Sequence, residues 1–247
     1  MRIVLAVCLS IGVVAASASV ARAEGINLYW NDCSPLRGGS GVTGLTNDCA
    51  SNTGSLSLVS SFIPPPGVTA LQAVESEIYV TLAAPSVPSW WQMQTGGCRA
   101  SSISAALQFV GRSACTKLWS SNALGFAQLD LNPLCCPDPR MARIRAVAAM
   151  PPEDTVATSP SLEYYAFEIL INHAKSIGVG SCEGCATAAC IELRYIRLYQ
   201  PAGPITFGSL VRADQNRFVT YNGAQVGDCA FTPVRNRTWG AVKSMYR

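Results

Sequence analysis

The amino-acid sequence predicts an all-β protein, built as a single antiparallel β-sandwich of the jelly-roll or immunoglobulin-like type and stabilised by disulfide bonds. Apolar and polar residues alternate along many short segments, and clusters of proline and glycine separate those segments. Helical periodicity is almost absent. With 247 residues, 49% of them hydrophobic, the chain is long enough to bury one sizeable core.

The first 23 residues have the pattern of a secretory signal peptide, which we expect to be removed. Arg2 provides the positive start, residues 3–20 are apolar and small, and Ala21-Arg22-Ala23 forms an A-x-A cleavage site. A membrane anchor is the alternative, but the segment lacks a basic stop-transfer flank. We therefore expect residues 24–247 to form the β-sandwich domain of a secreted protein, periplasmic or extracellular, with no membrane span after cleavage.

The strands are predicted from alternating side chains and from the turn residues that bound each run. Alternation is clearest in 77–82, 126–131, 142–146 and 163–172, where one side of each run is apolar. The complete set of predicted strands is 26–30, 55–63, 77–82, 102–110, 126–131, 142–146, 163–172, 191–199, 205–211 and 218–221.

Proline-rich turns punctuate these strands at 64–67, 133–139, 151–152 and 201–204. A division into two small sandwiches near 133–139 is an alternative, but one shared core is the simpler interpretation. Residues 101–107 allow a short helix instead of a strand.

Ten cysteines remain after removal of the signal peptide, and an even number in an exported chain indicates up to five disulfides. They are Cys33, Cys49, Cys98, Cys115, Cys135, Cys136, Cys182, Cys185, Cys190 and Cys229. An Asn-Asp-Cys sequence ends at Cys33 and again at Cys49, so we predict a bridge between them, worth about 3 kcal/mol. The similar spacing of Cys98 and Cys115 predicts a second bridge.

The other six cysteines cannot be paired from the sequence. Adjacent Cys135 and Cys136 are expected to reach two different elements, with Cys229 and the 182–190 cluster as candidates. Within that cluster, Cys182 and Cys185 form a C-x-x-C motif. A thioredoxin-like redox motif would open a helix in a βαβ unit, and a zinc knuckle would need a second cysteine pair. Neither context is present, so structural disulfides are favoured.

Several segments resemble a group of known sequences when they are read together. They are the opening Leu28-Tyr-Trp-Asn-Asp-Cys33, the stretch Pro88-Ser-Trp90-Trp91 with Cys98-Arg99 nearby, the region 167–190, and the ending from Trp239 to Arg247. Together they resemble exported β-rich proteins of environmental bacteria that carry no assigned activity. The resemblance implies an exported bacterial β protein, and it transfers neither a catalytic residue nor a substrate.

Two candidate binding sites follow from the residues themselves. Trp90 and Trp91 lie at a strand start or loop mouth, where one exposed ring would stack on a sugar or a partner protein; the alternative is that both rings close the end of the sandwich. Asp32 and Asp48 offer oxygen ligands for calcium if a Cys33–Cys49 bridge brings them together. Their alternative role is to satisfy backbone groups in turns. No other cofactor is expected.

Charge and motifs limit the function classes. Only 13% of residues are charged, and the formal net charge of +3 is too balanced for an electrostatic nucleic-acid binder. The one histidine, His173, leaves no material for a multi-histidine metal site. Neither G-x-S-x-G nor H-E-x-x-H occurs. No residue is therefore assigned a catalytic role.

We expect an exported, non-enzymatic protein with a structural or binding role at the cell surface or outside the cell. Its partner would be a surface protein or a glycan, or a second copy docked through the aromatic C-terminal segment from Trp239 to Arg247. The alternative is an exported enzyme. It would be either a thiol–disulfide oxidoreductase using Cys182 and Cys185 or a hydrolase using a carboxylate pair. The nearest pairs are Glu75 with Glu77 and Glu163 with Glu168.

Overall fold

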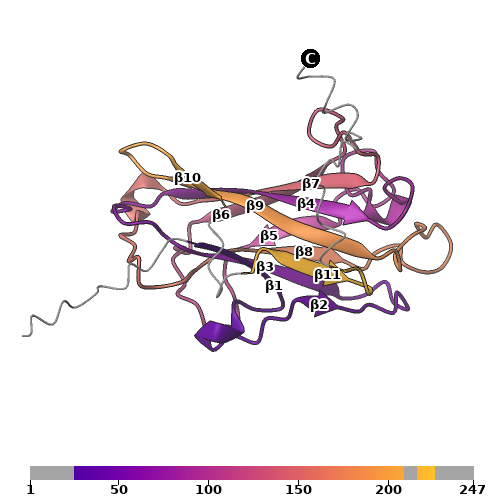
Figure 1. Ribbon diagram of the computed structural model, residues 1–247, viewed down its shortest axis with the longest axis horizontal. Coiled ribbons are helices and arrows are strands. Elements are labelled where there is room, and N and C mark those ends of the chain that lie inside the picture. The colour runs from indigo at the N-terminus through magenta and orange to yellow at the C-terminus, as the bar shows by residue number, and fades with distance from the viewer. Residues whose placement is uncertain (1–24, 209–215, 226–247) are drawn as a thin grey trace, which may run out of the picture.

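The computed structural model describes residues 25–208 and 216–225, which form two β-sheets packed face to face (Figure 1). Within these residues one sheet has four strands and the other has seven. The predicted signal peptide, residues 1–23, and the C-terminal segment from Trp239 to Arg247 lie outside the described residues. In the described part, no helix is long and apolar enough to cross a membrane.

The four-stranded sheet is antiparallel throughout. Its order is β1 (Gly25–Trp30), β3 (Ser55–Ile63), β8 (Tyr164–Asn172) and β5 (Ile103–Ala106). β8 shows alternate burial, as its period-two sequence pattern predicted, whereas β1 and β3 are buried at almost every residue. The predicted bounds of β3 are those observed, and residues 103–106 are a strand, not a helix.

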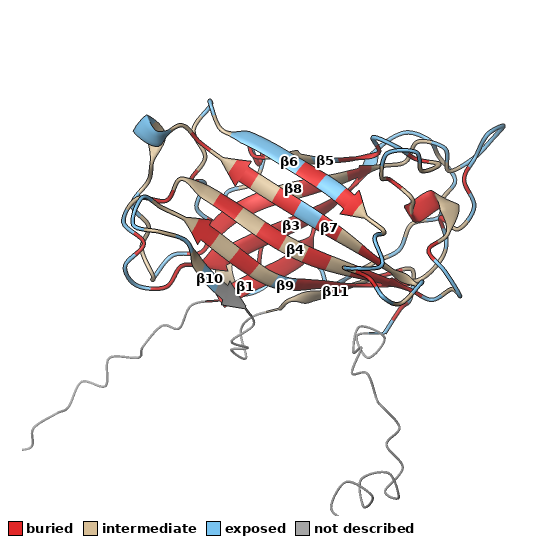
Figure 2. Cartoon of the chain, turned by 90° about the horizontal axis from the view of Figure 1, so that it is seen from above, coloured by how far each residue is buried: buried red, intermediate tan, exposed pale blue. Residues whose placement is uncertain are grey.

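The seven-stranded sheet forms the other layer. Its order is β2 (Gly44–Leu45), β11 (Phe218–Tyr221), β9 (Ala189–Tyr199), β4 (Ala73–Leu82), β7 (Met141–Ala149) and β6 (Leu124–Asp130), and β10 (Ile205–Gly208) also pairs with β9. The two-residue strand β2 was not predicted, because it is too short to show alternation. Figure 2 shows the buried positions recurring along β4, β7 and β9.

The strands of the sandwich pair in both nested and crossed order along the chain. β3 pairs with β8 while β4 pairs with β7, so these two pairs are nested along the chain. β5 and β6 follow at one edge of each sheet, beside β8 and β7. An immunoglobulin-like sandwich instead pairs its second strand with its fifth and its third with its sixth, without nesting. β4 also pairs with β9, and this pair crosses the β3–β8 pair along the chain, so the sandwich combines nested and crossed pairs.

One hydrophobic core lies between the sheets and receives side chains from both. At one end it contains four aromatic rings, those of Trp30, Trp90, Trp91 and Tyr221, and all four are completely buried. Successive centroids in this cluster lie 5.3–6.4 Å apart, the normal range for interacting rings.

Three short 3-10 helices lie in the loops: η1 (Pro35–Arg37), η2 (Ser89–Trp91) and η3 (Pro152–Asp154). The second of these carries Trp90 and Trp91 into the core.

Both predicted disulfide pairs are wrong. Cys33 is bonded to Cys115, not to Cys49, and Cys98 is bonded to Cys182, not to Cys115. The predictions paired cysteines that lie close together in the sequence. The sandwich instead brings together loops that are far apart in the sequence, and the observed bridges join residues 82 and 84 positions apart.

The remaining cysteines divide into two groups. Cys49 is bonded to Cys185, and Cys190 is disulfide-bonded as well. Cys135 and Cys136, which were expected to reach two different elements, are both free thiols in the described structure.

Candidate functional site

Trp90 and Trp91 do not form an exposed binding platform. Both lie on η2 instead of a strand, so they do not point to opposite sides, and both are completely buried. The indole nitrogen of Trp90 donates a hydrogen bond to the Ser176 hydroxyl at 2.9 Å. The structure thus has the arrangement in which the two rings close the end of the sandwich.

Arg99 holds this end together from inside. Its guanidinium stacks on Trp90, 3.6 Å from the ring centroid, and the residue is only 1% exposed. It donates hydrogen bonds to the backbone carbonyls of Trp90 at 2.9 Å, of Ala174 at 2.8 Å and of Asn172. Burial lowers the pKa of Arg99 to about 10, so it remains charged at neutral pH. Its donors serve the protein's own backbone, which makes Arg99 a structural residue.

The calcium hypothesis loses its geometric basis. It required a Cys33–Cys49 bridge to bring Asp32 and Asp48 together, and that bridge does not form. Among the described residues, no group of three or more His, Cys, Asp or Glu side chains could hold a metal ion. Asp48 is exposed and accepts a hydrogen bond from the backbone N–H of Ala50 at 3.0 Å. This is the turn-capping role that was the alternative.

The Asp32 carboxylate is buried and already occupied by donors. It accepts hydrogen bonds from Tyr165 Oη at 2.7 Å, from Cys33 N at 2.8 Å, and from the backbone and hydroxyl of Ser40. Burial alone would raise the pKa of Asp32, but these hydrogen bonds outweigh it and hold the pKa below its usual value. The Asp32 carboxylate therefore joins three segments: the turn after β1, Ser40 beyond η1, and Tyr165 on β8.

Asp32→Asn is expected to lower the free energy of unfolding, by an amount that depends on pH. Because the folded-state pKa of Asp32 is lowered, its stabilisation is present above the unfolded pKa, about 3.9, and is lost as the pH falls through the folded pKa. We expect Asp32→Asn to lower the free energy of unfolding by about 1–2 kcal/mol at pH 7, and the difference to shrink at pH 3. Urea unfolding at both pH values measures this; an equal difference at both would contradict it.

The C-x-x-C motif is not a dithiol. Cys182 is bonded to Cys98 and Cys185 to Cys49, so neither thiol is paired with the other or free to react. Both residues are buried. The motif therefore fastens two separate loops to the segment before β9, which is the structural interpretation favoured from the sequence.

The carboxylates considered for hydrolysis are held by basic or polar partners. Glu168 contacts Arg112 at 2.6 Å, and burial is outweighed by hydrogen bonds from Arg112 and Ser57, so its pKa is lowered. A general acid needs the opposite shift. Glu75 and Glu77 are ion-paired on the seven-stranded sheet, as described below.

The outer faces of the two sheets differ. On the four-stranded sheet, Val59 and Tyr165 are covered by loops and form a small second core with Phe109 and the Cys33–Cys115 disulfide. The rings of Phe109 and Tyr165 stack with centroids 4.4 Å apart. The outer face of the seven-stranded sheet instead shows its strands directly in the described part of the chain (Figure 2).

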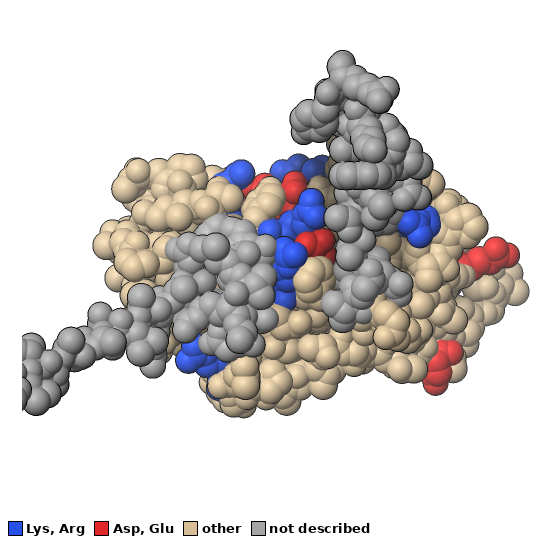
Figure 3. Space-filling model, viewed as in Figure 1, with Lys and Arg blue, Asp and Glu red and all other residues tan. Residues whose placement is uncertain are grey.

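Charged and aromatic side chains of the seven-stranded sheet gather on this outer face, which we call the arginine face. They come from β4, β6, β7 and β9 and from the start of β11, and Figure 3 shows both signs of charge gathered on this side of the molecule. The arginine face comprises Arg143, Arg145, Arg194, Arg197, Arg217, Glu75, Glu77, Asp130, Glu192, Tyr79, Tyr195, Tyr199 and Phe218. As described, it contains no lysine.

Ion pairs run across the strands of the arginine face. Arg143 on β7 contacts Glu77 on β4 at 3.0 Å and Asp130 on β6 at 3.1 Å. Glu75 forms ion pairs with Arg197 at 3.2 Å and with Arg145 at 3.6 Å. The strand register causes this, because Asp130 lies directly opposite Arg143 and Glu75 directly opposite Arg197. The pairs Arg143–Glu77 and Arg145–Glu75 are diagonal neighbours on β7 and β4. The charged groups are thereby held in a fixed arrangement.

Three guanidinium groups lie over aromatic rings of the same face. Arg194 lies 5.1 Å from the ring centroid of Tyr79, and Arg197 lies 5.4 Å from that of Tyr195. Arg217 lies 4.6 Å from the ring centroid of Phe218. Burial, with Glu77 and Glu75 nearby, raises the pKa of Tyr195 to about 12. The phenol of Tyr195 therefore stays neutral at physiological pH. The aromatic rings attract the guanidinium groups above them and so help to fix the positions of the arginines.

An apolar margin adjoins the arginine face along β6 and β7. Leu124 is 78% exposed and Phe126 is 59% exposed, and both lie on the outer side of β6. Val147 and Ala149 lie opposite them on β7. Phe126 also lines a cavity of roughly 350 Å³ beside β5 and β6. Exposed apolar side chains next to fixed charges are a common feature of binding surfaces.

Sequence reasoning missed this surface. Residues 142–146 were predicted only as a strand with one apolar side, and Glu75 with Glu77 was considered only as a carboxylate pair for hydrolysis. A signal was present, because arginines or glutamates occur at i and i+2 in the predicted strands 142–146 and 191–199, and Glu75 with Glu77 repeats this spacing at the start of the predicted strand 77–82. Only the order of the strands in the sheet brings these rows together.

Comparison with known proteins gives no family assignment. No protein-family model and no curated protein sequence matches this chain. Among solved structures, the chain is similar to a cohesin module of a family 33 glycoside hydrolase from Clostridium perfringens ATCC13124, at 9% identity and a TM-score of 0.35, over 81% of this chain and 98% of that chain.

It is also similar to the second type II cohesin module of the adaptor scaffoldin ScaA from Acetivibrio cellulolyticus, at 10% identity and a TM-score of 0.32, over 83% of this chain and 99% of that chain. A further type II cohesin domain from the cellulosome of Acetivibrio cellulolyticus gives 11% identity and a TM-score of 0.28, over 81% of this chain and 95% of that chain. Similarities of this size give no basis for transferring a function.

Proposed function

We propose that this protein is an exported, non-enzymatic binding protein and that its arginine face binds a partner protein. The observation that carries the proposal is the rigid set of arginines, tyrosines and carboxylates fixed on the open side of the seven-stranded sheet. Arginine and tyrosine are enriched at the centres of protein interfaces, and lysine is depleted there.

A protein partner fits this surface better than a glycan does. Sugars stack on the open faces of aromatic rings, but guanidinium groups lie over Tyr79, Tyr195 and Phe218. The two tryptophans that would have offered a platform are buried. Exposed Leu124 and Phe126 beside the face supply the apolar contact that a protein interface requires.

The disulfides support the exported part of the proposal. Three of them join residues 82, 84 and 136 positions apart, so they depend on the folded sandwich. Structural disulfides of this kind persist in oxidising compartments and are rare in the cytosol. Removal of the signal peptide would release a chain whose N-terminal strand is β1.

Arg145→Glu is expected to weaken partner binding strongly while the fold is kept. The Arg145 side chain is 48% exposed, so loss of the ion pair with Glu75 and repulsion from Glu77, which lies opposite, should together lower the free energy of unfolding by no more than about 1 kcal/mol. Binding should weaken about 30-fold or more, as expected for the loss of an interface hot spot. The measurement is saturable binding of the labelled protein to the envelope fraction of cells that export it.

Lys117→Glu is the matched control for this experiment. It makes the same charge change at an exposed position in the loop before Leu118, next to the bridge that joins Thr116 to Tyr164 of the four-stranded sheet. We expect this variant to bind within about twofold of the unmodified protein. Equal weakening by the two substitutions would show that net charge, not the arginine face, governs binding and would contradict the proposal.

A further inference from the structure

A pocket of roughly 350 Å³ lies between β5 and β6, which are the last strands at the same side of the two sheets (Figure 2). Its inner residues are apolar and buried, namely Met93, Ile103, Ala127 and Leu129. Phe126, which is 59% exposed, lies at its margin beside the arginine face. The pocket therefore adjoins the surface that we propose binds the partner protein.

One buried acceptor of this pocket has no donor. Gln94 lines the pocket, and its side-chain oxygen Oε1 is buried and accepts no hydrogen bond from the described part of the chain. A buried amide oxygen without a donor destabilises the folded state. Native proteins contain few such atoms, so each one requires an explanation. A ligand that carries a hydrogen-bond donor into the pocket provides that explanation.

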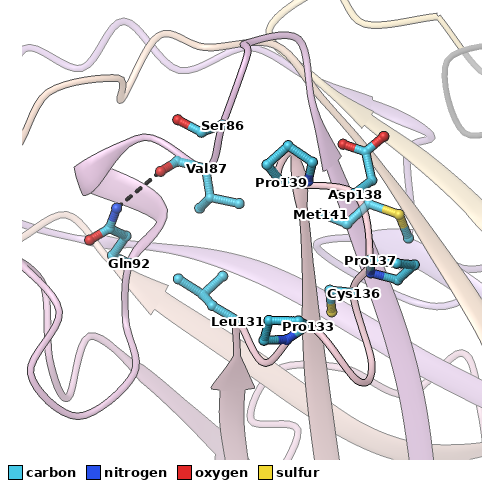
Figure 4. A pocket seen from close by; sticks show the side chains of 10 residues that line it. All are labelled: Ser86, Val87, Gln92, Leu131, Pro133, Cys136, Pro137, Asp138, Pro139 and Met141. Atoms are coloured by element: carbon cyan, nitrogen blue, oxygen red, sulfur yellow. Dashed lines mark hydrogen bonds between the residues drawn. The ribbon is translucent and has the colours of Figure 1, made fainter.

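Another pocket of similar size differs in this respect. Figure 4 shows this pocket, which has a volume of roughly 360 Å³. Its glutamine, Gln92, donates from Nε2 to the carbonyl of Val87 at 3.0 Å, and its carboxylate, Asp138, is ion-paired with Arg140. No residue that lines it has a buried side-chain nitrogen or oxygen without a partner in the described structure. The unpaired acceptor thus distinguishes the pocket beside β6.

Building on the proposed function, we propose that the pocket beside β6 receives an aromatic side chain of the partner protein, a tyrosine or a tryptophan, whose O–H or N–H donates to Gln94 Oε1. These two side chains combine a large apolar body with one uncharged donor. The ring of Phe126 and the thioether of Met93 both interact favourably with an aromatic ring. Lysine or arginine is disfavoured because no residue that lines the pocket is charged.

The donor of the inserted side chain determines its selection. A site with a buried hydrogen-bonding group rejects an analogue that cannot pair with that group. Phenylalanine has almost the shape of tyrosine, but it leaves Gln94 Oε1 unpaired. Tyrosine and tryptophan are also the residues most often found as anchors in the pockets of protein interfaces. A ring with a donor is therefore expected to bind more tightly than a ring without one.

The test uses capped amino acids as probes and the full exported chain with its disulfides intact. N-acetyltyrosinamide and N-acetyltryptophanamide carry the donor, and N-acetylphenylalaninamide is the matched probe without it. The protein is labelled at the methionine methyl groups and titrated with each probe. The NMR signals of Met93, in the pocket beside β6, and of Met141, in the pocket of Figure 4, report binding at each place.

We expect the two donor probes to shift the Met93 signal, to leave Met141 unchanged, and to bind about fivefold or more tightly than the phenylalanine probe. Gln94→Leu should abolish this preference and, because it removes an unpaired acceptor, raise the Tm. Gln92→Leu is the matched control. It should keep the preference and lower the Tm, because it removes the hydrogen bond to Val87.

The same two variants test whether the pocket contributes to partner binding. In the measurement with the envelope fraction, Gln94→Leu should weaken binding about fivefold or more, and Gln92→Leu should stay within about twofold of the unmodified protein.

Three results would overturn the proposal. One is equal affinity for the tyrosine and phenylalanine probes. Another is an equal shift of the Met93 and Met141 signals, which would show non-specific binding. A third is envelope binding that Gln94→Leu leaves unchanged while Arg145→Glu weakens it. In that case the arginine face keeps its proposed function. Absence of envelope binding by the unmodified protein instead contradicts the proposed function, and the probe titration still decides what the pocket binds.

Discussion

Replacing both Cys49 and Cys185 with serine is expected to lower the free energy of unfolding by about 5 kcal/mol. The bridge joins residues 136 positions apart, and a loop of that length gives about this value in the chain-entropy model. The effect is large because a domain of this kind is stable by only about 5–15 kcal/mol. Urea unfolding followed by tryptophan fluorescence measures it.

The bridge also positions the aromatic end of the core. Tyr221 donates a hydrogen bond to the backbone carbonyl of Cys185 at 3.0 Å and accepts one from Asn47 at 3.0 Å, and its ring stacks on Trp90. Without the bridge we expect the tryptophan fluorescence of the folded state to change as well. The control is the double variant Cys135→Ser with Cys136→Ser, which removes two thiols that form no disulfide. Equal destabilisation by the two double variants would contradict the expected role of the bridge.

Arg99→Met is expected to cost about 4 kcal/mol of stability. Methionine fills part of the volume, but it leaves the carbonyls of Trp90, Asn172 and Ala174 buried without their donor. Each unsatisfied buried carbonyl costs about 1–3 kcal/mol, and the stacking on Trp90 is lost too. Chemical unfolding at pH 7 gives the value.

The comparison for Arg99 is an exposed arginine. Arg140 is 41% exposed and pairs with the nearby Asp138 at the surface, so Arg140→Met should change stability by less than about 0.5 kcal/mol. Arg99→Lys should recover less than half of the loss, since an ammonium group cannot reach three carbonyls in the planar guanidinium arrangement. A loss below about 1 kcal/mol in Arg99→Met would show that water replaces the guanidinium at these carbonyls.

The strands were predictable because each shows its burial pattern locally. In β8, Phe167, Ile169 and Ile171 are buried while Glu168 and Leu170 are less so, and the alternation can be read from the sequence. The same holds for β4 and β7. The two-residue strand β2 carries no such pattern and is defined by its parallel pairing with β11. The alternation of buried and exposed side chains therefore predicts the longer strands, whereas a short strand such as β2 is found only from its pairing with a neighbour.

The disulfides and the candidate site were not predictable for the opposite reason. Cys33 and Cys115 meet because one loop follows β1 and another crosses the outer face of the four-stranded sheet, a juxtaposition of residues 82 positions apart. Arg143 meets Glu77 because β7 lies beside β4 in the sheet. Such contacts depend on the order of strands, which alternation in a single sequence does not specify.

The most direct test of the proposed function places a photo-activated cross-linking amino acid at position 145, on the arginine face, in cells that export the protein. We expect one discrete cross-linked protein product at position 145, its loss when Arg194→Glu is added, and no product with the cross-linker at exposed position 179. A product of the same mass from positions 145 and 179, or none from position 145, would contradict the claim that the arginine face binds a partner.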